Sequence, residues 1–155
     1  MSTINQDITA SADWISQALN SSGYRADFTS QSLREIDRFF DEHSQNGAAR
    51  PGGLLSTGLG QRIFALGSYI GAVVRRQLGG RWVGDDSDPE AEINVELQLP
   101  DGTHCWPVQR AMKRFKNGTE DGIAAWGIGL GLEVGSASEP SQKTSTKSLL
   151  KRLFK

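Results

Sequence analysis

The sequence predicts an α+β fold in which helices pack on a small antiparallel sheet of about three strands, followed by a disordered C-terminal tail. Apolar side chains recur at helical spacing in several segments, and between two of them the period changes from 3.6 to 2, which is typical of strands. A length of 155 residues suits one domain. We expect that domain to span residues 1–135, with residues 136–155 as a flexible linker and a short basic amphipathic tail.

The first predicted helix begins near Ser11, a residue type favoured at helix N-termini, and ends at Gly23. Its expected apolar stripe consists of Trp14, Ile15, Ala18 and Leu19.

The second predicted helix begins at a capping box formed by Ser32 and Glu35. Its apolar residues are Leu33, Ile36, Phe39 and Phe40. His43 ends this helix, where an imidazolium would complement the helix dipole. Residues 45–53 contain a proline and several glycines and are expected to form a loop.

Residues 60–78 form the longest apolar segment, and we expect it to be the central core helix because it is too long for a strand. Gly67 and Gly71 are four residues apart and share a face on which another element can approach closely. Each glycine costs about 1 kcal/mol relative to alanine inside a helix, so close packing is expected to compensate.

The strand pattern follows this helix. Residues 81–84 suit a short strand, and residues 93–99 alternate between apolar and polar side chains. Residues 100–102 form a tight turn, and residues 103–106 return as the partner strand. Alternation places Cys105 on one face of this hairpin and both His104 and Trp106 on the other.

Two more helices are predicted beyond the hairpin. Pro107 suits the first position of a helix that ends at Asn117 and Gly118. Thr119 is the expected N-cap of a helix that runs to about Trp126. Residues 127–134 alternate glycine with aliphatic side chains, which suits either a helix or a strand.

Several spaced motifs in the central part of the chain resemble a small bacterial protein family catalogued only as a domain of unknown function. They are Leu66-Gly-Ser-Tyr-Ile-Gly71, Gly79-Gly-Arg-Trp82, Leu99-Pro-Asp-Gly102 and Asn117-Gly-Thr-Glu-Asp121. The resemblance covers about residues 61–126 and implies a bacterial origin and a compact α+β domain, but the family carries no assigned reaction. Ala72 stands where the family often has glutamate, so any role of that carboxylate is absent here or has moved.

The sequence contains no convincing catalytic or cofactor motif, so we expect no cofactor. One cysteine excludes an intrachain disulfide, and its histidine neighbour points to the opposite face of a strand, which excludes a Cys–His dyad from these two residues. The alternative is a small enzyme whose polar residues converge only in the fold. For that alternative the residues of interest are His104, Asp101, Tyr69 and Arg81.

Residues 85–92 contain five carboxylates. Asp86 and Asp88 could contribute to a divalent-ion site, but the glycine and the terminal glutamate of an EF-hand loop are missing. A solvated loop is the expectation, and ion binding stays open.

The best candidate for a partner-binding site is the basic amphipathic tail, whose apolar residues would form one stripe in a helix. The candidate residues are Leu149, Leu150, Lys151, Arg152, Leu153 and Phe154. A protein groove or, more weakly, an anionic membrane surface would suit such a segment.

Nucleic acid is a disfavoured partner. The basic residues Arg110, Lys113, Arg114 and Lys116 could form a patch, but no recognised nucleic-acid module accompanies them. The formal net charge of the chain is −1.

We therefore expect a cytoplasmic, non-enzymatic domain that acts through protein–protein contacts, as a regulator or an immunity-type protein. The N-terminus shows neither the basic nor the apolar region of a signal peptide, and no apolar run is long enough to span a membrane. The alternatives are the small enzyme and a peripheral binder of membrane or nucleic acid that uses the basic tail.

Overall fold

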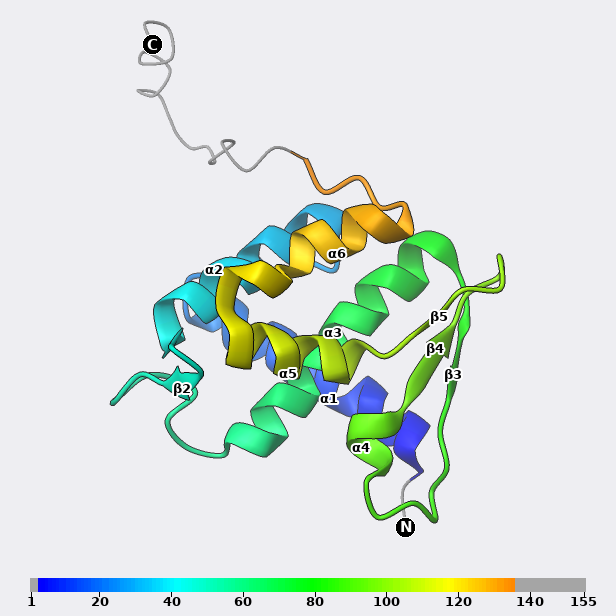
Figure 1. Ribbon diagram of the computed structural model, residues 1–155, viewed down its shortest axis with the longest axis horizontal. Helices are drawn as coiled ribbons and strands as arrows, with labels where there is room; N and C mark the ends of the chain where they lie inside the picture. The colour runs from blue at the N-terminus through cyan, green and yellow to red at the C-terminus, as the bar shows by residue number, and fades with distance from the viewer. Residues whose placement is uncertain (1–2, 136–155) are drawn as a thin grey trace, which may run out of the picture.

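The computed structural model describes residues 3–135 and confirms the predicted α+β fold (Figure 1). The α-helices are α1 (Ile4–Ser21), α2 (Leu33–His43), α3 (Leu59–Leu78), α4 (Ala91–Asn94), α5 (Pro107–Asn117) and α6 (Ile123–Leu130). The strands are β1 (Ser44–Gln45), β2 (Ala48–Ala49), β3 (Arg81–Val83), β4 (Glu96–Gln98) and β5 (His104–Cys105). Two 3₁₀ turns, η1 (Ser30–Ser32) and η2 (Gly118–Asp121), complete the fold. The predicted linker and tail, residues 136–155, lie outside the described residues.

Helix α3 is the central element, as predicted, and most of its side chains are buried. Helices α1 and α5 both pack against it (Figure 1). A Cβ atom added to Gly67 would lie 2.5 Å from the Cα of Val108 in α5, and one added to Gly71 would lie 2.1 Å from the indole of Trp82. The predicted close approach on this glycine face is confirmed.

Helix α1 begins at Ile4, two turns before the predicted start at Ser11. A capping box fixes this start: Gln6 N–H donates to the Thr3 hydroxyl, and Thr3 N–H donates to the Gln6 side chain. The buried stripe is Ile4, Ile8, Ala12, Ile15 and Leu19. Trp14 does not belong to this stripe, and half of it (50%) is exposed. Its predicted place in the apolar stripe was wrong, because the buried stripe starts at Ile4 and passes beside Trp14.

Helix α2 begins at Leu33 with Ser32 as its N-cap, as predicted, but the expected capping box does not form. Ser32 donates its hydroxyl proton to the Thr29 carbonyl or shares it with the hydroxyl of Tyr69. Glu35 accepts from the backbone N–H of Arg25 instead of turning back to the helix start. The helix is preceded by η1, whose N-cap is Thr29. Both side chains thus bond to partners outside the predicted capping box.

The predicted loop 45–53 contains part of a two-stranded hairpin, β1–β2, in which Gln45 pairs with Ala48. Asn46 and Gly47 form its turn, both with positive φ. Asn-Gly is the sequence that favours such two-residue hairpin turns.

The three-stranded sheet has the order β3-β4-β5 with antiparallel pairing. Leu97 lies opposite both Trp82 and Cys105. Cys105 is buried while His104 and Trp106 are exposed, so the predicted alternation is confirmed.

The strand predicted over residues 93–99 is shorter than expected, because residues 91–94 form the helical turn α4. Ala91 N–H donates to the Asp88 carbonyl, and the Asn94 amide donates to the Asp88 carboxylate. The apolar alternation still holds at Val95 and Leu97, which are buried.

The chain after the sheet follows the prediction until Gly118. Pro107 occupies the first turn of α5, and Gly118 ends it with φ of +75°. Thr119, the predicted helix cap, lies in η2 instead, and α6 begins at Ile123. Residues 127–130 are helical, and residues 131–134 form neither helix nor strand.

Candidate functional site

The predicted partner-binding residues, Leu149, Leu150, Lys151, Arg152, Leu153 and Phe154, lie outside the described residues. Their role stays a prediction.

The structure brings two of the four residues proposed for a hidden enzyme site into one row of the sheet. Arg81 in β3 lies opposite Gln98 in β4, which lies opposite His104 in β5. The Arg81 guanidinium donates to the Gln98 amide oxygen at 3.3 Å. The His104 ring contacts the carboxylate of Glu96 on the same face. Asp101 lies in the neighbouring turn, where its carboxylate accepts from the N–H of Thr103 at 2.8 Å.

Tyr69, the fourth of these residues, lies apart in the core. Its hydroxyl accepts from the backbone N–H of Phe28 at 3.0 Å and forms a hydrogen bond of 2.6 Å with the Ser32 hydroxyl. Burial raises the pKa of this phenol, which is fully enclosed. Tyr69 thus ties the 28–32 segment to α3, and the four residues do not converge on one site.

Cys105 is not an activated nucleophile. Burial, and secondarily the negative charge of Glu96, raise the pKa of its thiol to about 11. The thiolate is the reactive form, so this thiol is almost entirely protonated and inert at neutral pH.

The carboxylates of the acidic loop are used for local structure. Asp86 accepts from the backbone N–H of Ile4 at 2.7 Å, at the N-terminus of α1. Asp85 and Asp88 accept from N–H groups two residues ahead of them. Within residues 3–135, no group of three or more histidine, cysteine or acidic side chains has an arrangement that could hold a metal ion.

Two of the basic side chains of α5 form ion pairs with acidic residues of the same domain. The Arg114 guanidinium is 3% exposed and paired with Asp37 and Asp41 of α2. Arg110 pairs with Asp121 at 3.0 Å and lies over the ring of Trp126. These two cations therefore do not extend a phosphate-facing patch.

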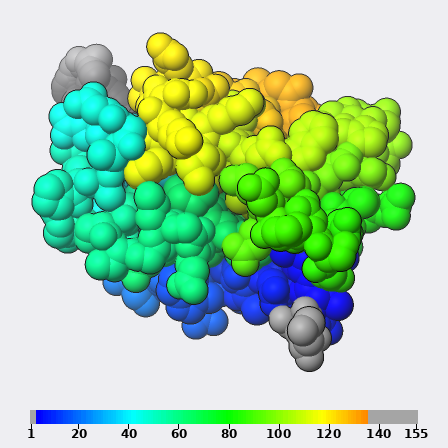
Figure 2. All heavy atoms as spheres, turned by 60° about the horizontal axis from the view of Figure 1, so that its bottom comes forward, coloured from blue at the N-terminus to red at the C-terminus, as the bar shows by residue number. Residues whose placement is uncertain are grey.

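The structure contains a groove between α1 and α3 that the sequence did not indicate. It has a volume of about 390 Å³ and opens on the face where α1, the start of α3 and the segment 85–94 lie side by side (Figure 2). Its lining comes from Asp7, Ala10, Ser11 and Trp14 of α1, Gln61, Phe64 and Ala65 of α3, and Glu92 of α4.

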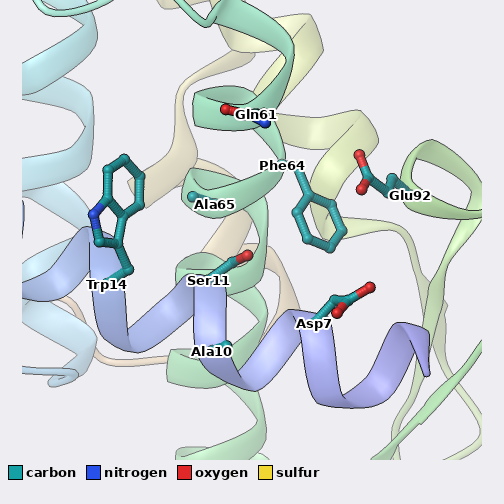
Figure 3. Close-up of a pocket in the computed structure, with 8 residues that line it drawn as sticks. All are labelled: Asp7, Ala10, Ser11, Trp14, Gln61, Phe64, Ala65 and Glu92. Carbon is teal, nitrogen blue, oxygen red and sulfur yellow. The ribbon is translucent and has the colours of Figure 1, made fainter. Parts of the chain in front are cut away.

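The groove has an apolar end and an acidic end. Figure 3 shows the Trp14 indole at one end, the carboxylates of Asp7 and Glu92 at the other, and the Phe64 ring between them. Phe64 is almost completely buried, whereas Trp14 offers half of its surface to solvent.

The two charged side chains that line the groove, Asp7 and Glu92, are both acidic. Helix α1 and the segment 85–92 together contain seven carboxylates, Asp7, Asp13, Asp85, Asp86, Asp88, Glu90 and Glu92, and no lysine or arginine. The hydrogen bond from Ile4 to Asp86 holds the acidic segment at the N-terminal end of α1. An apolar groove with an acidic border suits a ligand that is both apolar and cationic.

One sequence signal could have identified Trp14 as a groove residue. If the apolar spacing is followed from Ile4, the stripe passes through Ala12 and Ile15 and leaves Trp14 on a flank of the helix. The contribution of Phe64 and Glu92 required the tertiary structure, because α3 and α4 reach α1 only after folding.

Within the part of the chain that the structure describes, no helix is both long and apolar enough to cross a bilayer. Comparisons of the chain with protein-family models, with curated proteins and with solved structures find no match.

Proposed function

We propose that this protein is a non-enzymatic interaction domain of the bacterial cytoplasm, with a regulatory or immunity-type role, that binds a basic amphipathic helix of a protein partner in the α1–α3 groove. The observation that carries this proposal is the half-exposed Trp14 at the apolar end of a groove whose other end holds Asp7 and Glu92.

A half-exposed tryptophan beside a pocket is the type of residue that dominates binding energies at protein interfaces. Trp14 stands next to the alanines Ala10 and Ala65, which leave room for the side chains of an incoming helix. A bound helix would gain most of its affinity from contacts with Trp14, because Phe64 offers little exposed surface.

The acidic end supplies direction and specificity. Glu92 and its neighbours would attract lysine or arginine side chains of the partner and repel an acidic helix. The binding is therefore expected to weaken as salt is added.

An enzyme is the weaker alternative. Arg81 and His104 share an exposed face of the sheet, but Tyr69 is enclosed in the core and Cys105 is protonated. These residues supply no nucleophile and base within reach of each other.

The test titrates a synthetic helical peptide, with leucines on one face and lysines on the other, into full-length chains by calorimetry. All of these chains carry Leu150→Ser and Leu153→Ser, so that the chain's own basic tail does not compete for the groove. Trp14→Ala is expected to weaken binding about tenfold, and Glu92→Lys severalfold, because each removes one end of the groove. Trp106→Ala and Glu120→Lys are the matched controls, since both residues are exposed outside the groove. Equal binding by all four variants would reject the groove, and so would equal binding of an acidic peptide.

A further inference from the structure

We propose that the groove is occupied in the free protein by the chain's own segment 147–155, docked in cis, so that a partner has to displace it. This docking rests on the proposed function of the groove as a site for basic amphipathic helices.

The charges of the two surfaces are complementary. The last 16 residues of the sequence contain five of its 17 basic side chains and none of its 18 acidic ones. The remaining 139 residues therefore carry a formal charge of −6, although the whole chain is close to neutral. Two of its carboxylates, Asp7 and Glu92, line the groove, and five more belong to α1 and the segment 85–92.

The pattern of the segment also fits the groove. Leu149, Leu150, Leu153 and Phe154 are spaced so that a helix would present them on one side. Nine helical residues have a length of about 13 Å, and the α1 residues from Asp7 to Trp14 extend over about 10 Å. The apolar side would face Trp14 and Phe64, and the cations would lie at the acidic end.

The connection to the segment is long enough. Arg34 of α2 donates two hydrogen bonds, of 2.6 and 3.0 Å, to the Gly135 carbonyl, which fixes the point from which the remaining chain departs. The 11 residues 136–146 can extend over at most about 40 Å. A folded domain with a radius of gyration of about 14 Å is about 37 Å across, a distance that the extended connection can span.

Tethering makes even a weak contact effective. A short flexible connection holds a segment at an effective concentration on the order of 1 mM. With an intrinsic dissociation constant of about 0.1 mM, the groove would be about 90% occupied, and an added peptide would bind about tenfold more weakly than to an empty groove.

The first measurement compares the affinity of the Leu/Lys peptide for the full-length chain with its affinity for the same chain carrying Leu150→Ser and Leu153→Ser. We expect these substitutions to tighten peptide binding about tenfold, because they release the groove. Thr146→Ala with Ser148→Ala is the matched control and should leave the affinity unchanged. Both substitution pairs lie outside the described residues, and the thermal midpoints should agree with that of the wild-type chain.

The second measurement locates the segment. A spin label is attached to the cysteine of the Ser148→Cys variant. Cys105 is buried and protonated and should not react with the label. The wild-type chain, treated in the same way, is the blank. We expect amide signals of residues 7–14 and 61–65 to broaden more than those of α6. Adding Leu150→Ser and Leu153→Ser should abolish this broadening. Mixing isotope-labelled chains with spin-labelled ones separates cis from trans.

The outcomes separate the two proposals. Equal peptide affinities with and without the leucines, together with no broadening at the groove, overturn the docking and leave the groove's function intact. Broadening at the groove without peptide binding to either chain supports the docking and overturns partner binding. Loss of both signals overturns both. Broadening that appears only between chains assigns the groove to a second copy and overturns docking in cis.

Discussion

At the scale of single residues, Asp37 connects three helices. Its carboxylate accepts from the Arg114 Nε at 2.9 Å, and also from the backbone N–H groups of Ile123 at 2.8 Å and Ala124 at 2.9 Å. Arg114 donates to Asp41 as well, at 2.6 Å. One carboxylate on α2 thus neutralises a buried guanidinium of α5 and caps α6, which has no side-chain cap of its own.

We expect Asp37→Ala to lower the free energy of unfolding by about 3 kcal/mol, because it leaves a buried cation without its enclosed partner and removes a helix cap. Asp41→Ala is the control. Its carboxylate is 56% exposed, so its loss should cost less than about 1 kcal/mol. Urea unfolding of both variants measures the difference, and losses of equal size would contradict the role assigned to Asp37.

The surroundings of His43 favour the neutral form of its imidazole ring. Its Nδ1 accepts from the backbone N–H of Leu54 at 3.0 Å, and its Nε2 lies 3.1 Å from the Tyr24 hydroxyl, which bonds to Glu42. Burial lowers the pKa of His43, with Glu42 opposing the shift and Arg50 adding to it. The predicted imidazolium at the end of α2 was therefore wrong: the ring serves as a hydrogen-bond acceptor.

A lowered folded-state pKa fixes the sign of the pH dependence. The unfolded chain binds a proton at His43 more readily than the folded chain, so the stabilisation by this residue is complete above the unfolded pKa of about 6.5 and declines as the pH falls below it. We expect the difference in unfolding free energy between the wild-type chain and His43→Gln to shrink from pH 7.5 to pH 5.5 in urea titrations. A difference that stays constant, or grows in acid, would show that His43 is not held neutral.

At the scale of the element, the glycines of α3 have separate roles. Gly67 is where α5 comes closest, since an added Cβ would lie 2.5 Å from the Val108 Cα and 2.9 Å from its nitrogen. Gly60, in the first turn of the same helix, has open space around it. The contact at Gly67 is with backbone, which cannot rotate away as a side chain can.

Gly67→Ala is expected to lower the free energy of unfolding by about 1–3 kcal/mol through overpacking. Gly60→Ala should raise it by up to about 1 kcal/mol, because alanine restricts the unfolded chain and favours the helix. Thermal unfolding followed by circular dichroism compares the two. A stabilising Gly67→Ala would mean that α5 can move away from α3 at little cost.

An element could be predicted from the sequence when the residues that fix its ends lie within it or next to it. Helix α3 and helix α5 were predicted from their own residues, with Pro107 and Gly118 marking the ends of α5. The start of α2 was predicted correctly, but its capping box was wrong because Ser32 bonds to Tyr69. The start of α6 was misplaced because its cap comes from Asp37. A capping rule applied to neighbouring residues cannot find a partner that lies 86 positions away.

At the scale of the whole molecule, the near-neutral net charge is the sum of a basic C-terminal segment and an acidic remainder of the chain. A segment of five positive charges follows a body of formal charge −6, and α1 with the segment 85–92 contains seven of the carboxylates of that body. Such an arrangement favours contact between the two parts at low salt and weakens it at high salt. The affinities of the groove for peptide and for the chain's own segment should therefore shift in parallel when salt is added.

By itself the sequence determined the class of fold, the central helix with its close-packed glycine face, the hairpin and the opposite faces of His104 and Cys105, because each depends on the period of a short segment. Only the tertiary structure decided where the groove lies. Trp14, Phe64 and Glu92 belong to three elements. They meet because α1 packs against α3 and the hydrogen bond from Ile4 to Asp86 holds the acidic segment at the start of α1. The sequence names the charges and apolar side chains, but their distances from one another follow from packing.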